Sequence, residues 1–122
     1  MLDAYIFDAV RTPRGKGRPD GSLHEVTSLA LSARLLNAVK DRNGLEGHAV
    51  EDVIWGNVTQ VKEQGGCLAR SAVLASDLDQ SIPGLSINRF CASQNIQRRI
   101  SLRSPSRKRP VRSATCSWMT QD

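Results

Sequence analysis

Residues 52–93 read DVIWGNVTQVKEQGGCLARSAVLASDLDQSIPGLSINRFCAS, and their pattern predicts a strand, a helix and a second strand. The run 52–58 is short and rich in residues that favour β-structure. Residues 67–77 carry small apolar side chains at helical spacing, and a Pro-Gly pair then precedes a β-prone run at 85–90. A strand–helix–strand unit of this kind places its two strands in parallel, with a right-handed crossover between them.

The chain before this unit adds a further strand and a longer helix. Residues 4–10 (AYIFDAV) form a β-prone run that stops at an Arg-Thr-Pro sequence, and a loop rich in Gly and charge follows. Ser22 and Glu25 have the spacing of a capping box, which predicts that the helix begins at Ser22. Gly44 supplies an end that tolerates the left-handed conformation. The whole pattern predicts an α/β fold of the βαβαβ type with a mainly parallel sheet.

The length and composition limit the chain to one domain. Its net positive charge lies at the carboxyl-terminal end. The chain has 122 residues, of which 39% are hydrophobic and 4% aromatic, and its net charge is +5. Residues 1–93 hold 10 Lys and Arg against 11 Asp and Glu, whereas residues 94–122 hold 7 against 1. The tail at 94–122 lacks a sustained apolar period, so we expect it to be disordered and to contain no packed element. The folded domain is expected at residues 2–93, and its balanced charge gives no reason to expect a nucleic-acid partner.

The cysteines stand at wide spacing, at Cys67, Cys91 and Cys116. They form no C-x-x-C pair and no cluster with His24 or His48, so neither a zinc site nor a disulfide scaffold is predicted. The first residues lack the basic start and apolar run of a secretory signal, and no apolar run approaches the ~20 residues that span a bilayer. We therefore expect a cytoplasmic protein with free thiols and no membrane partner.

Cys91 stands where the strand at 85–90 ends and a helix would begin. The N–H groups and the dipole at a helix N-terminus favour an anion, which lowers the pKa of a thiol and makes it nucleophilic. Position alone favours a buried and inert cysteine instead, because free Cys packs well as a small hydrophobic residue. The surrounding residues are needed to decide between these two interpretations.

The stretch SINRFCAS, residues 86–93, resembles the nucleophile motif N-x-x-C-x-S-G of the thiolases. Three more stretches are similar to the same family, in the same order. They are DAVRTPRGKGRPDGSL at 8–23 (first strand and R-T-P-x-G loop), DVIWGNV at 52–58 (second strand) and GGCLARSAVLAS at 65–76 (the helix that follows). The resemblance covers residues 2–93, and the chain is identified as a member of the thiolase family, amino-terminal part only. The ketoacyl synthases share the fold and a cysteine nucleophile but match these motifs less well.

The resemblance implies an acyltransferase of the acetyl-CoA C-acyltransferase type, which acts on 3-oxoacyl-CoA or acetyl-CoA in fatty acid metabolism, including β-oxidation. Cys91 would be the acyl-thioester nucleophile, coenzyme A would be a substrate, no other cofactor or metal would be needed, and the protein would form a homo-oligomer. The family's other catalytic groups, a G-H-P histidine and a C-x-G cysteine, have no matching motif in this chain. We therefore expect the chain alone to be inactive. A noncatalytic interaction fragment, or a nucleic-acid-binding protein acting through the basic tail, is the alternative.

Gln94 marks a break in the resemblance, because the family has Gly at this position after C-x-S. The match stops abruptly after Ser93 instead of fading, and Arg, Ser and Pro then become dense. Such a break is the expected signature of a gene read in a shifted frame. We therefore expect another frame of the gene to encode the rest of a thiolase.

The other residues with reactive or binding side chains have simpler interpretations. His24 and His48 have no partner motif and are expected to be solvated or to cap helices. Cys67 is expected to pack at the start of its helix, and the Gly pair at 65–66 is expected to form a turn in preference to a phosphate cradle. Arg11 is expected to pair with a buried carboxylate or to shape its loop, with a direct contact to substrate as the minority interpretation.

Overall fold

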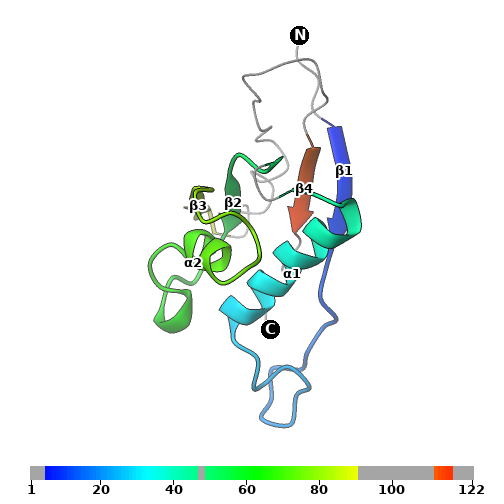
Figure 1. Ribbon diagram of the computed structural model, residues 1–122. Coiled ribbons are helices and arrows are strands. Elements are labelled where there is room, and N and C mark those ends of the chain that lie inside the picture. Colours follow the sequence, from blue (N-terminus) through cyan, green and yellow to red (C-terminus); the bar gives the residue numbers. More distant parts are fainter. Residues whose placement is uncertain (1–4, 47–48, 91–111, 117–122) are drawn as a thin grey trace.

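The computed structural model describes residues 5–46, 49–90 and 112–116. The elements, in chain order, are β1 (Tyr5–Val10), α1 (Ser28–Asn43), β2 (Val53–Gly56), the 3-10 helix η2 (Lys62–Gln64), α2 (Leu68–Leu74), β3 (Gly84–Ile87) and β4 (Arg112–Cys116). Figure 1 shows their arrangement, with α1 and α2 packed in front of the strands.

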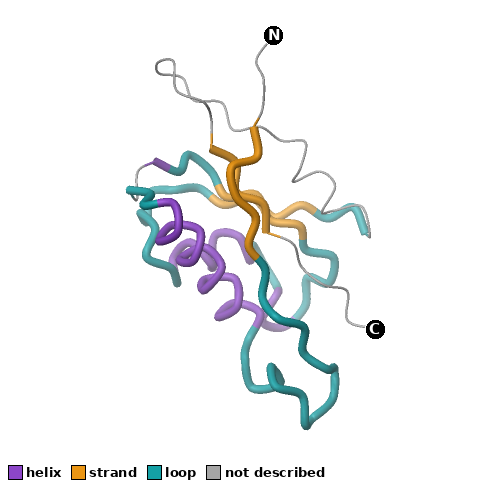
Figure 2. Tube along the Cα trace, turned by 90° about the vertical axis from the view of Figure 1, so that its right-hand side faces the viewer, coloured by secondary structure: helices purple, strands orange, loops and turns teal. Residues whose placement is uncertain are grey.

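The strands form two parallel pairs. β2 pairs with β3, with Val53 opposite Gly84, and β1 pairs with β4, with Tyr5 opposite Arg112. Because α2 lies between β2 and β3 in the chain, the predicted strand–helix–strand unit is confirmed. Figure 2 shows both helices on the same side of the strands. The predicted α/β class, with parallel strands and covering helices, is therefore confirmed.

The first helix begins later than its sequence predicts. Ser22 and Glu25 lie in a run of turns, so the predicted capping box is wrong. Thr27 caps α1 instead, because its extended backbone lets Oγ1 accept a hydrogen bond from the Ala30 N–H at 3.1 Å. The carboxylate of Glu63, from η2, accepts from the N–H of Ser28 at 3.0 Å and from its hydroxyl at 2.7 Å. A partner distant in the chain thus helps to fix the start of the helix.

The end of α1 follows the prediction. Gly44 has a φ of +55°, and its N–H donates to the Asp41 carbonyl at 3.3 Å, while the Leu45 N–H donates to the Lys40 carbonyl at 3.0 Å. Glycine adopts this left-handed conformation without the steric cost that a Cβ brings. The predicted stop at Gly44 is confirmed.

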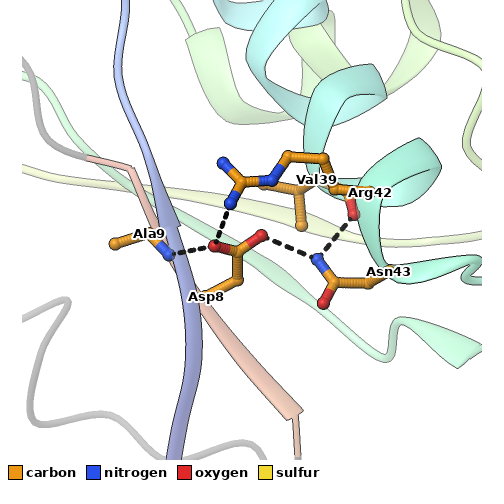
Figure 3. Close-up of polar contacts among 5 residues, drawn as sticks. All are labelled: Asp8, Ala9, Val39, Arg42 and Asn43. Carbon is orange, nitrogen blue, oxygen red and sulfur yellow. Dashed lines mark hydrogen bonds and ion pairs between the residues drawn. The ribbon is translucent and has the colours of Figure 1, made fainter.

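Asp8 joins β1 to the last turn of α1 (Figure 3). Its carboxylate accepts hydrogen bonds from Asn43 Nδ2 at 2.9 Å and from the Ala9 N–H at 2.8 Å, and Arg42 Nη2 lies 3.3 Å away. Asn43 also donates to the Val39 carbonyl at 2.9 Å. The hydrogen bond from Asn43 is the main reason that the pKa of Asp8 lies below its ordinary value, and the Ala9 N–H and Arg42 act in the same direction against partial burial.

The core lies where α2 packs against β2 and β3. Ala69, Ala72 and Val73 of α2 are fully buried, and Trp55 of β2 is 3% exposed. A Cβ on Gly84, the first residue of β3, would lie 2.5 Å from the backbone nitrogen of Arg70. The small side chains of α2 and the bare backbone of Gly84 therefore allow helix and strand to approach closely. The core cluster comprises Val10, Leu35, Val39, Val53, Trp55, Leu68, Ala69, Val73, Leu78 and Ile82.

One strand lies within the basic tail. Residues Arg112–Cys116 form β4, so the expectation of no packed element in the tail does not hold for this segment. The physical reason is that main-chain pairing needs an extended partner with free N–H and C=O groups, as the edge of β1 supplies, and requires no apolar period in the added strand. The rest of the tail lies outside the described residues, and its predicted disorder stays a prediction.

Candidate active site

β3 leads along the chain to the predicted nucleophile. The strand ends at Ile87, whereas the sequence predicted its end at Phe90. Cys91 follows Phe90 directly and lies outside the described residues. Its catalytic role therefore stays a prediction, and the geometry that bears on it is that of the residues leading up to it.

β2 and β3 end side by side just before the chain reaches Cys91. Gly56 lies opposite Ile87, and the Asn57 N–H donates to the Ile87 carbonyl at 3.0 Å. Because the two strands are parallel, both present their carboxyl ends at this edge. Ligands of open α/β sheets bind beyond the carboxyl ends of the strands. Ile87, four residues before Cys91 in the sequence, therefore lies at the edge of the strand pair that suits a reactive group.

Asn88 shapes the turn between β3 and Cys91. Its Oδ1 accepts a hydrogen bond from the Phe90 N–H at 3.0 Å, and its Nδ2 donates to the Val58 carbonyl, just past β2, at 2.9 Å. Phe90 has a φ of +50°. In the sequence, Asn88 is one letter of the N-x-x-C-x-S-G motif, and no role was predicted for it. The available signal was that Asn side chains accept hydrogen bonds from the N–H two residues further on.

Cys67 links the start of α2 to β3. Its thiol donates to the Gly84 carbonyl at 3.3 Å, and its sulfur lies 3.6 Å from the hydroxyl of Ser86. The same hydroxyl accepts from the Ala69 N–H at 3.3 Å. The half-buried side chain packs against the core, as its sequence context predicted.

The environment of Cys67 also changes its acidity. Burial raises the pKa of the thiol and is the largest single influence. Hydrogen bonds from the N–H groups of Arg70, Ser86 and Ala69 and from the Ser86 hydroxyl favour the thiolate, and together they hold the pKa below its ordinary value. Cys67 is therefore a thiol beside β3, and any chemical test of Cys91 must distinguish the reaction of Cys91 from that of Cys67.

Proteins of one family match most of the chain. The family model described as the thiolase N-terminal domain matches residues 4–96. The chain belongs to the thiolase family. Proteins named 3-ketoacyl-CoA thiolase from Yersinia pestis (strain Pestoides F), Cronobacter sakazakii and Pseudoalteromonas atlantica are 42%, 40% and 38% identical to this thiolase chain over 94 residues. Those residues are 76% of the chain and 24% of each relative, so the chain spans about a quarter of the length of these curated relatives.

The remaining candidates in this thiolase chain are exposed or lie in a turn, where the structure describes them. His24 Nε2 lies 3.9 Å from the exposed carboxylate of Glu25, and Arg11 is exposed. His48 lies outside the described residues. The glycines at 65–66 form a turn, as predicted, in which the Gly65 N–H donates to the Lys62 carbonyl at 2.9 Å.

Within the described residues of this thiolase chain, no helix combines the length and apolar character that crossing a bilayer requires. The same residues contain no group of three or more His, Cys, Asp or Glu side chains placed to hold a metal ion.

Proposed function

We propose that this chain supplies the nucleophile of an acyltransferase that moves acyl groups between 3-oxoacyl-CoA or acetyl-CoA and coenzyme A. Membership of the thiolase family carries the proposal, and relatives named 3-ketoacyl-CoA thiolase support the class of substrate. Cys91 is the proposed nucleophile because it stands at the cysteine position of the family motif and follows, four residues later in the sequence, the carboxyl end of β3 in a parallel strand pair.

The proposed reaction passes through an acyl-cysteine. The thiolate of Cys91 attacks the 3-oxo carbon of the substrate, the C2–C3 bond breaks, and the electron pair of that bond stays with the two-carbon unit, which takes up a proton to become acetyl-CoA. The thiol of coenzyme A then attacks the acyl-cysteine, passes its proton to a base, and releases the thiolate of Cys91. Both steps need an acid-base group and donors for a developing oxyanion.

We further propose that this chain does not complete the reaction by itself, because the G-H-P and C-x-G motifs that the family uses for acid-base chemistry do not occur in it. Coenzyme A is the proposed second substrate, with no additional cofactor or metal, and the working enzyme is a proposed homo-oligomer. A cytoplasmic location is proposed because a reducing compartment keeps the Cys91 thiol free.

The test assays cleavage of 3-oxoacyl-CoA with free coenzyme A. One sample is the chain as it stands, and the other is residues 1–93 joined to the downstream part of a thiolase relative. We expect cleavage from the joined protein only, with loss of activity on Cys91→Ala and retention on Cys67→Ala. Cleavage that survives Cys91→Ala, or Cys91-dependent turnover by the 122-residue chain alone, would overturn the proposal.

A further inference from the structure

Phe90 holds an unusual backbone conformation directly before Cys91. Its φ of +50° lies in the left-handed region, which a residue with a bulky side chain rarely occupies. Among the described residues other than glycine, Lys62 is the only other one with a positive φ. The Phe90 side chain is 78% exposed, so burial of the ring contributes little to holding this conformation. Something in the surrounding main chain or side chains must hold it.

Asn88 supplies two hydrogen bonds that fix this turn from opposite sides. The acceptor Oδ1 binds the Phe90 N–H at 3.0 Å and closes a turn over two residues. The donor Nδ2 binds the Val58 carbonyl at 2.9 Å and so anchors the same side chain to the chain beyond β2. The neighbouring main-chain bond from Asn57 to Ile87, at 3.0 Å, continues the strand pairing up to this point. These bonds therefore anchor the turn to the pair formed by β2 and β3.

We infer that Asn88 is a positioning residue for Cys91: by holding Phe90 in the left-handed conformation, it sets the direction in which the chain leaves β3 and presents the cysteine. The inference rests on the proposed function, in which Cys91 is the acyl nucleophile. The strained residue lies next to the reactive one in the chain, as is common where backbone strain serves a function. A nucleophile displaced by a small backbone rotation loses alignment with the groups that activate it.

The test measures alkylation of each cysteine in the 122-residue chain by iodoacetamide, as a function of pH, with peptide mass spectrometry separating Cys67, Cys91 and Cys116. In Asn88→Ala we expect the alkylation rate of Cys91 at neutral pH to fall about tenfold, because alkylation proceeds through the thiolate and a redirected cysteine loses the surroundings that favour it. Cys67, which bonds to Gly84 and packs on β3, serves as the folding control. Its rate in Asn88→Ala should stay within about twofold of its rate in the parent chain, because its own contacts are unchanged.

Two substitutions at Phe90 separate a positioning role from a merely structural one. Phe90→Gly and Phe90→Ala both remove the ring, but only glycine occupies positive φ without steric cost. Combined with Asn88→Ala, Phe90→Gly should restore the reactivity of Cys91 to within about twofold of the parent, because the turn no longer needs the hydrogen bond. Phe90→Ala should restore none of it. If Asn88→Ala changes the alkylation rate of Cys67, the experiment is repeated with Asn88→Ser, whose shorter side chain keeps a hydrogen-bond acceptor.

The possible outcomes are distinct. If Cys91 of the unmodified chain reacts no faster than in urea, the turn does not activate it and the inference is overturned, while the proposed function, which draws its acid-base groups from outside this chain, is decided by the cleavage assay. If Cys91 is activated and Asn88→Ala leaves its rate unchanged while Cys67 reacts as it does in the parent, the inference is overturned and the proposed function stands. A loss of reactivity that glycine at position 90 restores no better than alanine does also overturns it, because the effect would then not act through the backbone of Phe90.

Discussion

Asp8 makes the attachment of β1 to α1 dependent on pH. Asn43, the Ala9 N–H and Arg42 all favour its carboxylate form and hold its pKa below the ordinary value, against a smaller opposing effect of burial. An unfolded chain has lost these contacts, so its Asp8 binds a proton more readily than the folded chain does. The contacts therefore stabilise the fold at pH values above the pKa of the unfolded state. The stabilisation is lost as the pH falls through the lower pKa of the folded state.

Replacing Asp8 with Asn should lower the stability of the chain more at neutral pH than in acid. A neutral amide oxygen accepts from Asn43 and the Ala9 N–H more weakly than a carboxylate does and cannot pair with Arg42, whereas in acid the parent carboxyl loses its charge as well. Urea unfolding midpoints measured at about pH 7 and about pH 3 test this, with a larger difference expected at the higher pH. Asp20→Asn, in the exposed loop, is the control. An equal effect of Asp8→Asn at both values would contradict the electrostatic explanation.

Gly84 permits close packing at one point where any side chain would collide. Its substitution by Ala places a Cβ 2.5 Å from Arg70 N and 2.8 Å from Ala69 C, both backbone atoms that a side-chain rotation cannot move. We expect the free energy of unfolding to fall by about 1–3 kcal/mol, the usual cost of overpacking. Gly44→Ala is the comparison that separates strain from collision. Its φ of +55° strains an alanine, but no atom lies within 4 Å of the added Cβ. In Gly84→Ala the alkylation rate of Cys67 should also rise, and Gly44→Ala should leave it unchanged.

At the scale of elements, α1 shows which signals in the sequence are sufficient. Its end was predictable because Gly44 acts through its own backbone conformation. Its start was predicted at Ser22, whereas Thr27 caps the helix, and Glu63, which lies far along the chain, binds Ser28 in its first turn. Local patterns thus predict an element, while partners from elsewhere decide where it begins.

Paired substitutions test whether the observed cap, Thr27, or the predicted cap, Ser22, stabilises the helix. Thr27→Ala removes the hydrogen bond to the Ala30 N–H and should lower the free energy of unfolding by about 1 kcal/mol. Ser22→Ala, at the cap that the sequence suggested, should change it by less than about 0.5 kcal/mol. Urea unfolding followed by circular dichroism measures both. The opposite ranking of the two variants would place the start of the helix at Ser22.

At the scale of the whole molecule, the α/β class and the family were predictable because the strand–helix–strand unit and the four family motifs are each contiguous in the sequence. Two features were not predictable. The turn at Asn88 depends on the Val58 carbonyl, thirty residues earlier in the chain. The pairing of β1 with β4 joins the two ends of the chain through main-chain groups, which leave no periodic pattern in the side chains.

That pairing leads to a prediction about the chain as a whole. A chain ending at residue 116 keeps β4, and a chain ending at residue 111 lacks it, so the two differ only by Arg112–Cys116. Without β4, the paired edge of β1 is left open, and its main-chain groups must bond to water or to another chain.

Amides of Tyr5–Val10 in the shorter chain should then exchange at least about tenfold faster, because loss of ~1.4 kcal/mol of protection corresponds to that factor. Hydrogen exchange followed by mass spectrometry measures the rate, and amides of Val53–Gly56, which pair with β3, provide the internal control. The shorter chain should also associate more readily at high concentration, as an open parallel edge favours pairing between molecules. Equal exchange of β1 in the two chains would show that β4 contributes nothing to holding the two ends together.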